Sequence, residues 1–178
     1  VPGNTMKKTP QAPVSLEYPA AFHERYMQLT LAQARLAMDD GEVPTGCVII
    51  HAYGTGERHK LIGRAHNQVE RLKDPTAHAE MLAITQAAAA VGDWRLTNTI
   101  LYVTKEPCAM CAGAIVLARI PLVVYGVPDQ HRWGAVSVFN ILNHKDLNHR
   151  SKVIAGILGD ECRSLLQTFF QQRRKGAR

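Results

Sequence analysis

Residues 105–116 of the chain read KEPCAMCAGAIV and place Cys108 and Cys111 three positions apart, after a proline and within an apolar run. The preceding residues 99–104, TILYVT, are β-branched and aromatic and predict a strand, so the cysteines open the helix that follows it. Residues at i and i+3 share one face of a helix, and the positive end of the helix dipole favours thiolates. From this pair alone, a disulfide, a redox switch and one end of a metal site all stay open.

The overall composition narrows these alternatives. The chain has 178 residues, 46% hydrophobic and 20% charged, which is typical of one globular domain. Its four cysteines are too few and too unevenly spaced for a disulfide framework. No apolar stretch reaches the ~20 residues of a membrane span, and the N-terminus lacks the apolar core of a signal peptide. We therefore expect a cytoplasmic protein without a membrane partner, in which a CxxC pair binds a metal or acts in catalysis more often than it forms a disulfide.

The formal net charge of +6 is concentrated most clearly at the C-terminus, where the last residues read QQRRKGAR. A basic helix end of this kind indicates an anionic partner such as nucleic acid. The alternative is that these side chains complement the helix dipole and remain solvated.

The rest of the chain predicts an α/β fold. The Pro-rich residues 1–15 lack apolar periodicity and are expected to be disordered, and residues 16–178 are expected to form a single domain. Strands are expected at 47–50, 61–62, 99–104, 121–126 and 152–157. Helices are expected at 22–39 and 108–119, from 160 onward, and from a cap at Asp74 or Thr76 to an end near Gly92. The expected order, α-β-β-α-β-α-β-α-β-α, counts the apolar segment 136–142 as the helix between the last two strands. Strands that alternate with helices predict a three-layer α-β-α fold in which helices flank a central mixed sheet.

His78, at the start of the helix before residues 99–104, supplies the third ligand that separates a metal site from a redox pair. One imidazole and two thiolates give zinc three protein ligands, and an open fourth position marks a catalytic rather than a structural site. Glu80 follows two residues after His78 and is suited to carry protons between a zinc-activated water and a substrate. We therefore expect one Zn²⁺ per chain, with His78, Cys108 and Cys111 as ligands and Glu80 as the catalytic residue.

The combination of HAE at one helix start and PCxxC at the next is similar to the signature of the zinc-dependent nucleoside and nucleobase deaminases. The chain most resembles the bacterial tRNA-specific adenosine deaminases, from about residue 22 to residue 174. The segments that carry this resemblance are DPTAHAEMLAI (74–84), LYVTKEPCAMCAGAI (101–115), NHR (148–150), GILGDEC (156–162) and FFQQRR (169–174).

The resemblance implies the cytidine deaminase-like fold and a homodimer. It also implies conversion of adenosine to inosine at the wobble position of a tRNA anticodon loop, usually that of an arginine tRNA. In this reaction a zinc-bound hydroxide attacks C6 of adenine.

The same resemblance implies roles for further residues. Asn67 corresponds to a base-contacting asparagine, while Val43 and Pro44 correspond to residues that line the pocket. Asp129 corresponds to an aspartate that meets the RNA backbone, although the segment DQHRWGAVS (129–137) departs from the small and basic residues usual in the family. Contacts with the anticodon loop are implied for Asn148, His149, Phe169, Phe170, Arg173 and Arg174, and one of the two phenylalanines is expected to belong to the core instead.

Two other functions stay open. The same fold and zinc site would serve a deaminase of a free base or nucleotide, such as guanine or cytosine, although the basic C-terminus argues against it. Such an enzyme would act on a free base without any RNA. The other alternative, a non-catalytic zinc-stabilised RNA-binding module, would have no use for Glu80 beside an open zinc position.

Overall fold

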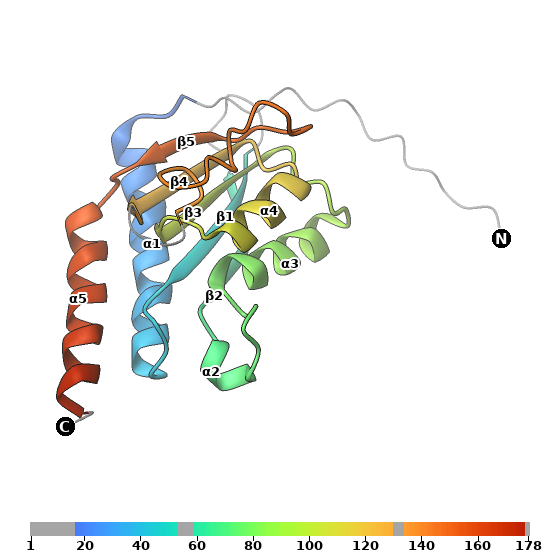
Figure 1. The fold of residues 1–178 in the computed structure, drawn as a ribbon. Helices are drawn as coiled ribbons and strands as arrows, with labels where there is room; N and C mark the ends of the chain where they lie inside the picture. Colours follow the sequence, from blue (N-terminus) through green and yellow to red (C-terminus); the bar gives the residue numbers. More distant parts are fainter. Residues whose placement is uncertain (1–16, 53–58, 130–133, 177–178) are drawn as a thin grey trace.

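The computed structural model describes residues 17–52, 59–129 and 134–176, so the expected disorder of residues 1–15 lies outside the described part of the chain. Its centre is a five-stranded sheet in the order β2-β1-β3-β4-β5 (Figure 1). The strands are β1 (Gly46–Ala52), β2 (His59–His66), β3 (Thr99–Lys105), β4 (Leu122–Val127) and β5 (Lys152–Ala155). The helices are α1 (Ala20–Asp39), α2 (Val69–Leu72), α3 (Ala79–Val91), α4 (Ala109–Leu117) and α5 (Gly159–Gly176). Within these ranges, no helix has the length and apolar character that crossing a membrane requires.

The sheet is mixed, as the sequence predicts. β1 pairs antiparallel with both β2 and β3, whereas β3, β4 and β5 run parallel. Every residue of β1 and nearly every residue of β3 and β4 is buried, because helices cover both faces of these strands. The parallel pairing brings the residues that follow β3 and β4 to the same edge of the sheet, where Glu106 N donates to Val127 O at 2.8 Å. The cysteine-bearing segment leaves the sheet at this edge.

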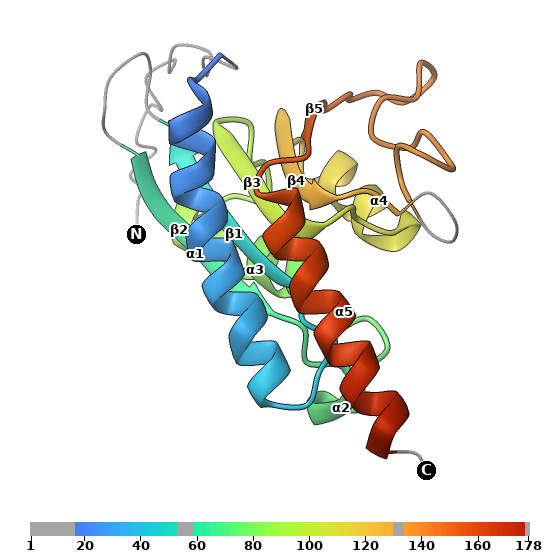
Figure 2. The same cartoon turned by 90° about the vertical axis from the view of Figure 1, so that its left-hand side faces the viewer.

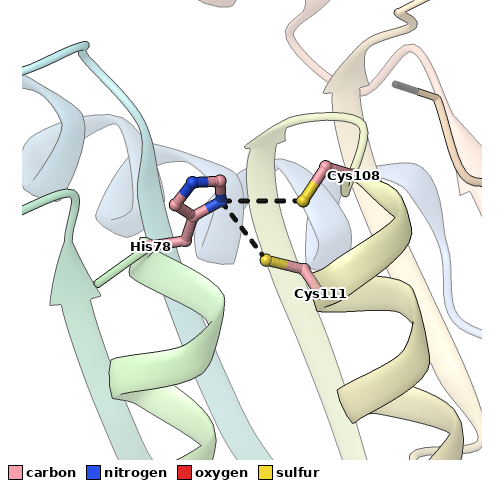
Figure 3. A group of neighbouring side chains, drawn as sticks. All are labelled: His78, Cys108 and Cys111. Atoms are coloured by element: carbon pink, nitrogen blue, oxygen red, sulfur yellow. Dashed lines mark hydrogen bonds between the residues drawn. The ribbon is translucent and has the colours of Figure 1, made fainter. Parts of the chain in front are cut away.

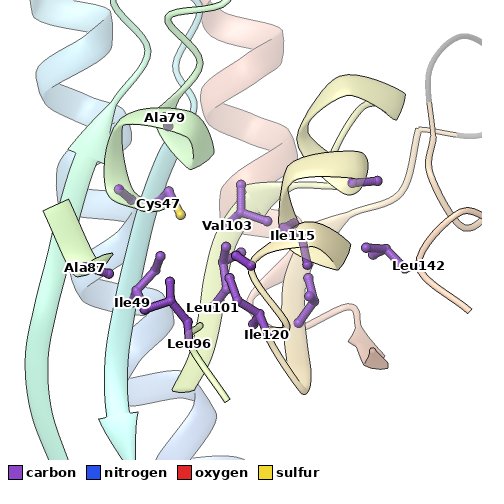
Figure 4. Packing of buried hydrophobic residues seen from close by; sticks show 14 of the residues in the cluster. Cys47, Ile49, Ala79, Ala87, Leu96, Leu101, Val103, Ile115, Ile120 and Leu142 are labelled. Atoms are coloured by element: carbon purple, nitrogen blue, oxygen red, sulfur yellow. The ribbon is translucent and has the colours of Figure 1, made fainter. Parts of the chain in front are cut away.

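Helices cover the two faces of the sheet in pairs. α1 and α5 lie on one face, and α3 and α4 lie on the other (Figures 1 and 2). The alternating side chains of the strands therefore enter two separate cores. The core under α3 and α4 contains Ile49, Leu101 and Ile115 (Figure 4), and the core under α1 and α5 contains Met27 and Tyr102. This arrangement confirms the expected three-layer α/β fold.

Helix α3 begins later than the sequence indicates. Residues 74–76 form a turn in which Asp74 Oδ1 accepts hydrogen bonds from N and Oγ1 of Thr76, at 2.8 and 2.7 Å. The expected cap at Asp74 or Thr76 is therefore wrong, and α3 starts at Ala79 with His78 as its N-cap. The physical reason is that Asp and Thr side chains stabilise such turns as readily as helix starts.

The expected helix at residues 136–142 is also wrong, because the described residues 134–151 form turns instead. The backbone N–H groups of Val136 and Ser137 each donate to the Glu106 carboxylate at 2.8 Å. Farther along, Val138 N and Phe139 N both donate to Gly134 O at 3.1 Å, so the successive i→i−4 hydrogen bonds of a helix are not formed. Conversely, the short helix α2 after β2 is not predicted from the sequence.

Gly46, at the start of β1, marks a close approach of α1 to the sheet. A Cβ atom there would meet the backbone O of Thr30 and would lie 2.6 Å from the backbone N of Ala34. We expect Gly46→Ala to lower the free energy of unfolding by about 1–3 kcal/mol, because the backbone of α1 cannot yield as a side chain would.

The matched control is Gly113 in α4, where a Cβ atom would meet nothing within 4 Å. Gly113→Ala should leave the free energy of unfolding unchanged or raise it by up to about 1 kcal/mol. Urea denaturation of both variants measures the difference, and equal stabilities for the two would contradict the packing of α1 on β1.

Candidate metal centre and active site

Two helix starts meet at one edge of the sheet and bring three metal-ligand side chains together. His78 is the N-cap of α3, Cys108 is the N-cap of α4, and Cys111 lies in the first turn of α4. His78 Nδ1 lies 3.7 Å from Cys108 Sγ and 3.5 Å from Cys111 Sγ, and the three ligand atoms lie within 4.8 Å of one another. The imidazole and both sulfurs point toward one another across the gap between the helices (Figure 3). The structure thus brings together the three residues that the sequence predicts as ligands.

The short contacts among these three side chains shift their pKa values in different directions. The hydrogen bond with Cys111, together with that to His78, lowers the pKa of the Cys108 thiol to about 4. The same contact with Cys108 raises the pKa of Cys111, and the hydrogen bond with Cys108 also raises the pKa of His78. One imidazole and two sulfurs form the donor set that zinc prefers, and three protein ligands leave the fourth tetrahedral position open. These residues therefore fit a zinc ion.

Glu80 occupies the first turn of α3 beside these ligands. It is 3% exposed, and its Oε2 atom is buried without a hydrogen-bond partner among the described residues. Burial raises the pKa of this carboxyl above its ordinary value. An unsatisfied buried oxygen costs about 1–3 kcal/mol, and such groups are found chiefly where they have a chemical function. This burial sets Glu80 apart from the residues that only fill the core.

A pocket of about 470 Å³ adjoins the cluster and collects residues from four separate parts of the chain, 41–45, 67–80, 105–108 and 169–173. Among its lining residues, those predicted from the sequence are Val43, Asn67, His78, Glu80, Cys108, Phe169, Phe170 and Arg173. Phe169 is 5% exposed and Phe170 is 48% exposed, so Phe169 is the phenylalanine that belongs to the core. The volume of the pocket is in the range of small-molecule sites, and its lining includes both aromatic and cationic side chains.

Comparisons with known proteins identify the family of the chain. The model of the MafB19-like deaminase family matches residues 22–174. A tRNA-specific adenosine deaminase of Streptococcus pyogenes is 46% identical over 163 residues, which cover 92% of this chain and 96% of the relative. The chain belongs to the tRNA-specific adenosine deaminase family.

Solved structures agree with this membership. A structure from a study of A-to-I editing by tRNA:A34 deaminases at the wobble position of transfer RNA is 37% identical, with a TM-score of 0.70. That match covers 80% of the deaminase and 99% of the solved chain. The guanine deaminase of Bacillus subtilis is 36% identical with a TM-score of 0.53, over 59% of the deaminase and 64% of the solved chain. The deaminase therefore shares more of its length with the tRNA:A34 enzyme.

The deaminase places three other predicted residues close to the pocket but not in its lining. Pro44 is buried in the loop before β1, and Arg174 lies on α5 beside Arg173 in a neighbouring groove. Asp129 contacts the pocket wall through Lys105, whose Nζ lies 2.7 Å from Asp129 Oδ2. The positive charge of Lys105 at the pocket is thus paired with an acid.

Asn148 and His149 do not lie at this pocket of the deaminase. His149 Nε2 donates to the carbonyl O of Ile120 at 2.8 Å, and Arg119 donates to Asn148 Oδ1. Arg119 and Ile120 precede β4, whereas the pocket lies beyond the end of β3, which runs parallel to β4. A strand of six residues spans about 20 Å, so these side chains lie toward the opposite edge of the sheet. Within one chain they cannot contact a base in the pocket.

Two buried glutamates at the site are not singled out by the sequence. Glu42 is 1% exposed, and its carboxylate accepts hydrogen bonds from Asn67 Nδ2 at 3.1 Å and from Arg71 N at 2.8 Å. Glu106 is 3% exposed and lies directly after β3. The available signal is a charged residue inside a segment otherwise predicted to be buried, because glutamate is rarely buried unless it has partners.

The Glu106 carboxylate accepts four hydrogen bonds. Its Oε2 accepts from Asp129 N and Ser137 Oγ, each at 2.7 Å, and its Oε1 accepts from Val136 N and Ser137 N, each at 2.8 Å. Burial acts to raise the pKa of Glu106, but these donors outweigh it, so the pKa lies below its ordinary value. The Glu106 carboxylate therefore fixes the positions of Asp129, Val136 and Ser137, which follow β4 in the chain.

We expect Glu106→Gln to lower the free energy of unfolding by about 2–4 kcal/mol at neutral pH, because glutamine offers one acceptor oxygen to four donors. The folded-state pKa of Glu106 is lowered, so its stabilisation is present above the unfolded-state value of about 4.3 and is lost as the pH falls through the folded-state value. Denaturation of parent and variant from neutral pH into acid should show their stabilities converge. A difference that is constant or grows in acid would contradict this role.

Proposed function

We propose that the protein converts adenosine to inosine at the wobble position of a tRNA anticodon loop. The observation that carries the proposal is the cluster of His78, Cys108 and Cys111 with the buried Glu80 at the pocket, in a chain that is 46% identical to a tRNA-specific adenosine deaminase. The reaction is a hydrolysis. The oxygen of water bonds to C6 of adenine, the bond from C6 to the exocyclic nitrogen breaks, and ammonia leaves.

His78, Cys108 and Cys111 would hold one zinc ion per chain. A set of one imidazole and two thiolates suits zinc better than it suits magnesium or calcium. A zinc ion held there would lower the pKa of a bound water to about 7 and would so supply a nucleophile at neutral pH. Cys111 is buried and the other two residues are partly exposed, so the substrate approaches from the pocket side.

Glu80 moves the protons of the reaction. Of the other carboxyls in the lining, Glu42 and Glu106 are engaged by hydrogen-bond donors, and Glu70 pairs with Lys73 at 3.7 Å. Glu80 alone among these four has a buried oxygen without a partner in the described structure. It takes one proton from the attacking water and delivers it to N1 of the adenine ring. It then carries the second proton of that water to the departing amine, which leaves as ammonia.

The walls of the pocket favour an RNA loop as substrate. α5 brings Phe170 and Arg173 to the pocket, and its last turn also contains Arg174 and Lys175. An anticodon loop offers unpaired bases that stack on aromatic side chains, while cations hold the phosphates. A free base would need no such cationic approach.

The finer assignments are part of the same proposal and rest on the family resemblance. Asn67 and Val43 contact the flipped base, and Asp129 contacts the RNA backbone. Pro44 is buried outside the pocket lining and is not assigned this contact. The substrate is an arginine tRNA, the protein acts as a homodimer in the cytoplasm, and residues 16–178 form one deaminase domain.

The test offers the purified protein an anticodon stem-loop with adenosine at the wobble position and, in parallel, free adenine, guanine and cytosine. Mass spectrometry should find inosine at that position, one ammonia per inosine, and no turnover of the free bases. A stem-loop with guanosine at the same position is the control. Turnover of a free base without inosine in the RNA would favour the free-base deaminase. Zinc and RNA binding without any turnover would favour the non-catalytic module.

We expect Glu80→Gln to lower the single-turnover rate by about 10²–10⁴-fold, because glutamine cannot carry a proton. The metal ligands are untouched, so elemental analysis should still find one zinc per chain. Glu161→Gln, at the exposed start of α5, removes the same charge away from the pocket and serves as the control. Near-parental turnover by Glu80→Gln would refute the proposed proton transfer.

Arg173→Gln and Arg174→Gln should each weaken stem-loop binding and flatten its salt dependence. Each lost phosphate contact lowers the slope of log K against log salt by about 0.7–0.9. Arg95→Gln is the control for net charge, because Arg95 stacks on Trp94 at 4.0 Å and lies outside the pocket lining. Unchanged slopes in both α5 variants would contradict the proposed phosphate contacts and would indicate that the basic end of α5 is only solvated.

A further inference from the structure

Glu42 contributes to the pocket through another residue. We propose that Glu42 is a positioning residue that fixes the orientation of the Asn67 side-chain amide, and thereby which hydrogen-bonding atoms the pocket offers to a base. This inference rests on the proposed function, because it takes a nucleobase as the occupant of the pocket.

The contact between the two side chains is buried and directional. Glu42 is 1% exposed, Asn67 is 7% exposed, and both line the pocket. Asn67 Nδ2 donates to Glu42 Oε2 at 3.1 Å, and no other side-chain hydrogen bond of Asn67 is formed within the described residues. A carboxylate can only accept hydrogen bonds, so the amide atom that faces it must be the NH₂ group. The carbonyl Oδ1 and the second N–H of Asn67 are left for a ligand.

Glu42 is itself held both at its backbone and at its carboxylate. Glu42 N donates to Ala37 O at 2.8 Å, which ties the residue to the end of α1. Its second oxygen, Oε1, accepts from Arg71 N at 2.8 Å in α2. Asn67 is anchored separately, because Asn67 N donates to Thr45 O at 3.0 Å. With both backbones fixed, the main freedom left to Asn67 is rotation of its side-chain amide. The hydrogen bond to the Glu42 carboxylate fixes that rotation.

This arrangement explains why the residue is glutamate rather than glutamine. Two donors, Arg71 N–H and Asn67 Nδ2–H, face the two oxygens of Glu42. Glutamine has only one acceptor oxygen, and its NH₂ group must face one of these donors. If the oxygen stays with Arg71, Asn67 has to turn its Oδ1 toward the glutamine, and the pocket then offers the base a different pattern of donors and acceptors.

A double-mutant cycle between Glu42 and Asn67 tests this coupling on the stem-loop substrate. Glu42→Gln should lower kcat/KM by about tenfold or more in the parent but by less than about twofold in the Asn67→Ala background. The dissociation constant for the stem-loop should change by less than about threefold, because phosphate contacts supply most of the RNA affinity. Losses that multiply independently, or an unaffected Glu42→Gln enzyme, would overturn the proposal.

Asp40→Asn is the matched control. Asp40 Oδ2 lies 3.2 Å from His66 Nε2 and 3.5 Å from Arg71 Nη1. Like Glu42, Asp40 therefore connects the chain after α1 to the region of β2 and α2. This variant loses the same charge and should keep kcat/KM within about twofold of the parent. A loss as large as that of Glu42→Gln would show that the loop, and not the orientation of Asn67, controls activity, and would overturn the proposal.

A second measurement needs no Glu42 variant and applies even where Glu42→Gln fails to fold. In the ¹⁵N-labelled parent, the Asn67 side-chain NH₂ resonance is assigned by its loss in Asn67→Ala. One of its two protons should exchange with water at least about tenfold more slowly than those of the exposed Asn143. Equal exchange would overturn the proposed hydrogen bond. A parent that makes no inosine would refute the proposed function, and this measurement would still test the contact.

Discussion

The site depends on the meeting of two helix starts over one face of the sheet. α3 and α4 pack side by side on that face, and each has a ligand at its N-cap, His78 in α3 and Cys108 in α4. An N-cap side chain lies where the backbone turns into the helix, so it can face a neighbouring helix start instead of the sheet. The resulting distances of 3.5 and 3.7 Å from His78 Nδ1 to the two sulfurs give a metal-ligand set built on rigid elements.

Three buried glutamates surround this centre, and their hydrogen bonding separates their roles. Glu42 and Glu106 are satisfied by donors from distant segments, so they hold the walls of the pocket in fixed positions. Glu80 has an oxygen without a partner in the described structure, and therefore has capacity left for a proton of the substrate or of water. A buried carboxylate whose oxygens are satisfied by donors keeps neighbouring segments in position, whereas one with an unsatisfied oxygen can still accept a proton or a hydrogen bond.

Local signals in the sequence predict that His78, Cys108, Cys111 and Glu80 lie near one another, because their positions follow from i, i+3 spacing and from two helix starts, and the structure places the three candidate ligands together. The mixed sheet and its two helical layers also follow from the alternation of patterns along the chain. The failures concern long-range partners. In the segment 136–142, which forms turns, the N–H groups of Val136 and Ser137 bond to Glu106, about 30 residues earlier, and no local pattern reveals that acceptor.

The same reason hides the Glu42–Asn67 pair, whose members are 25 residues apart. Contacts with distant residues also determine where Asn148 and His149 lie. Their hydrogen bonds to Arg119 and Ile120 keep them away from the pocket of their own chain. Short motifs determine the chemistry of this protein, while contacts between distant segments determine the shape of the pocket around it.

The central claim is a zinc centre with three protein ligands and one position open to water. X-ray absorption at the zinc edge of the purified protein measures this directly. We predict two sulfur neighbours at about 2.3 Å, one nitrogen at about 2.0 Å and one further light atom from water. That light atom should be perturbed when a stem-loop with a hydrated purine analogue at the wobble position binds. A site closed by four protein ligands, or a different set of sulfurs, would contradict the account.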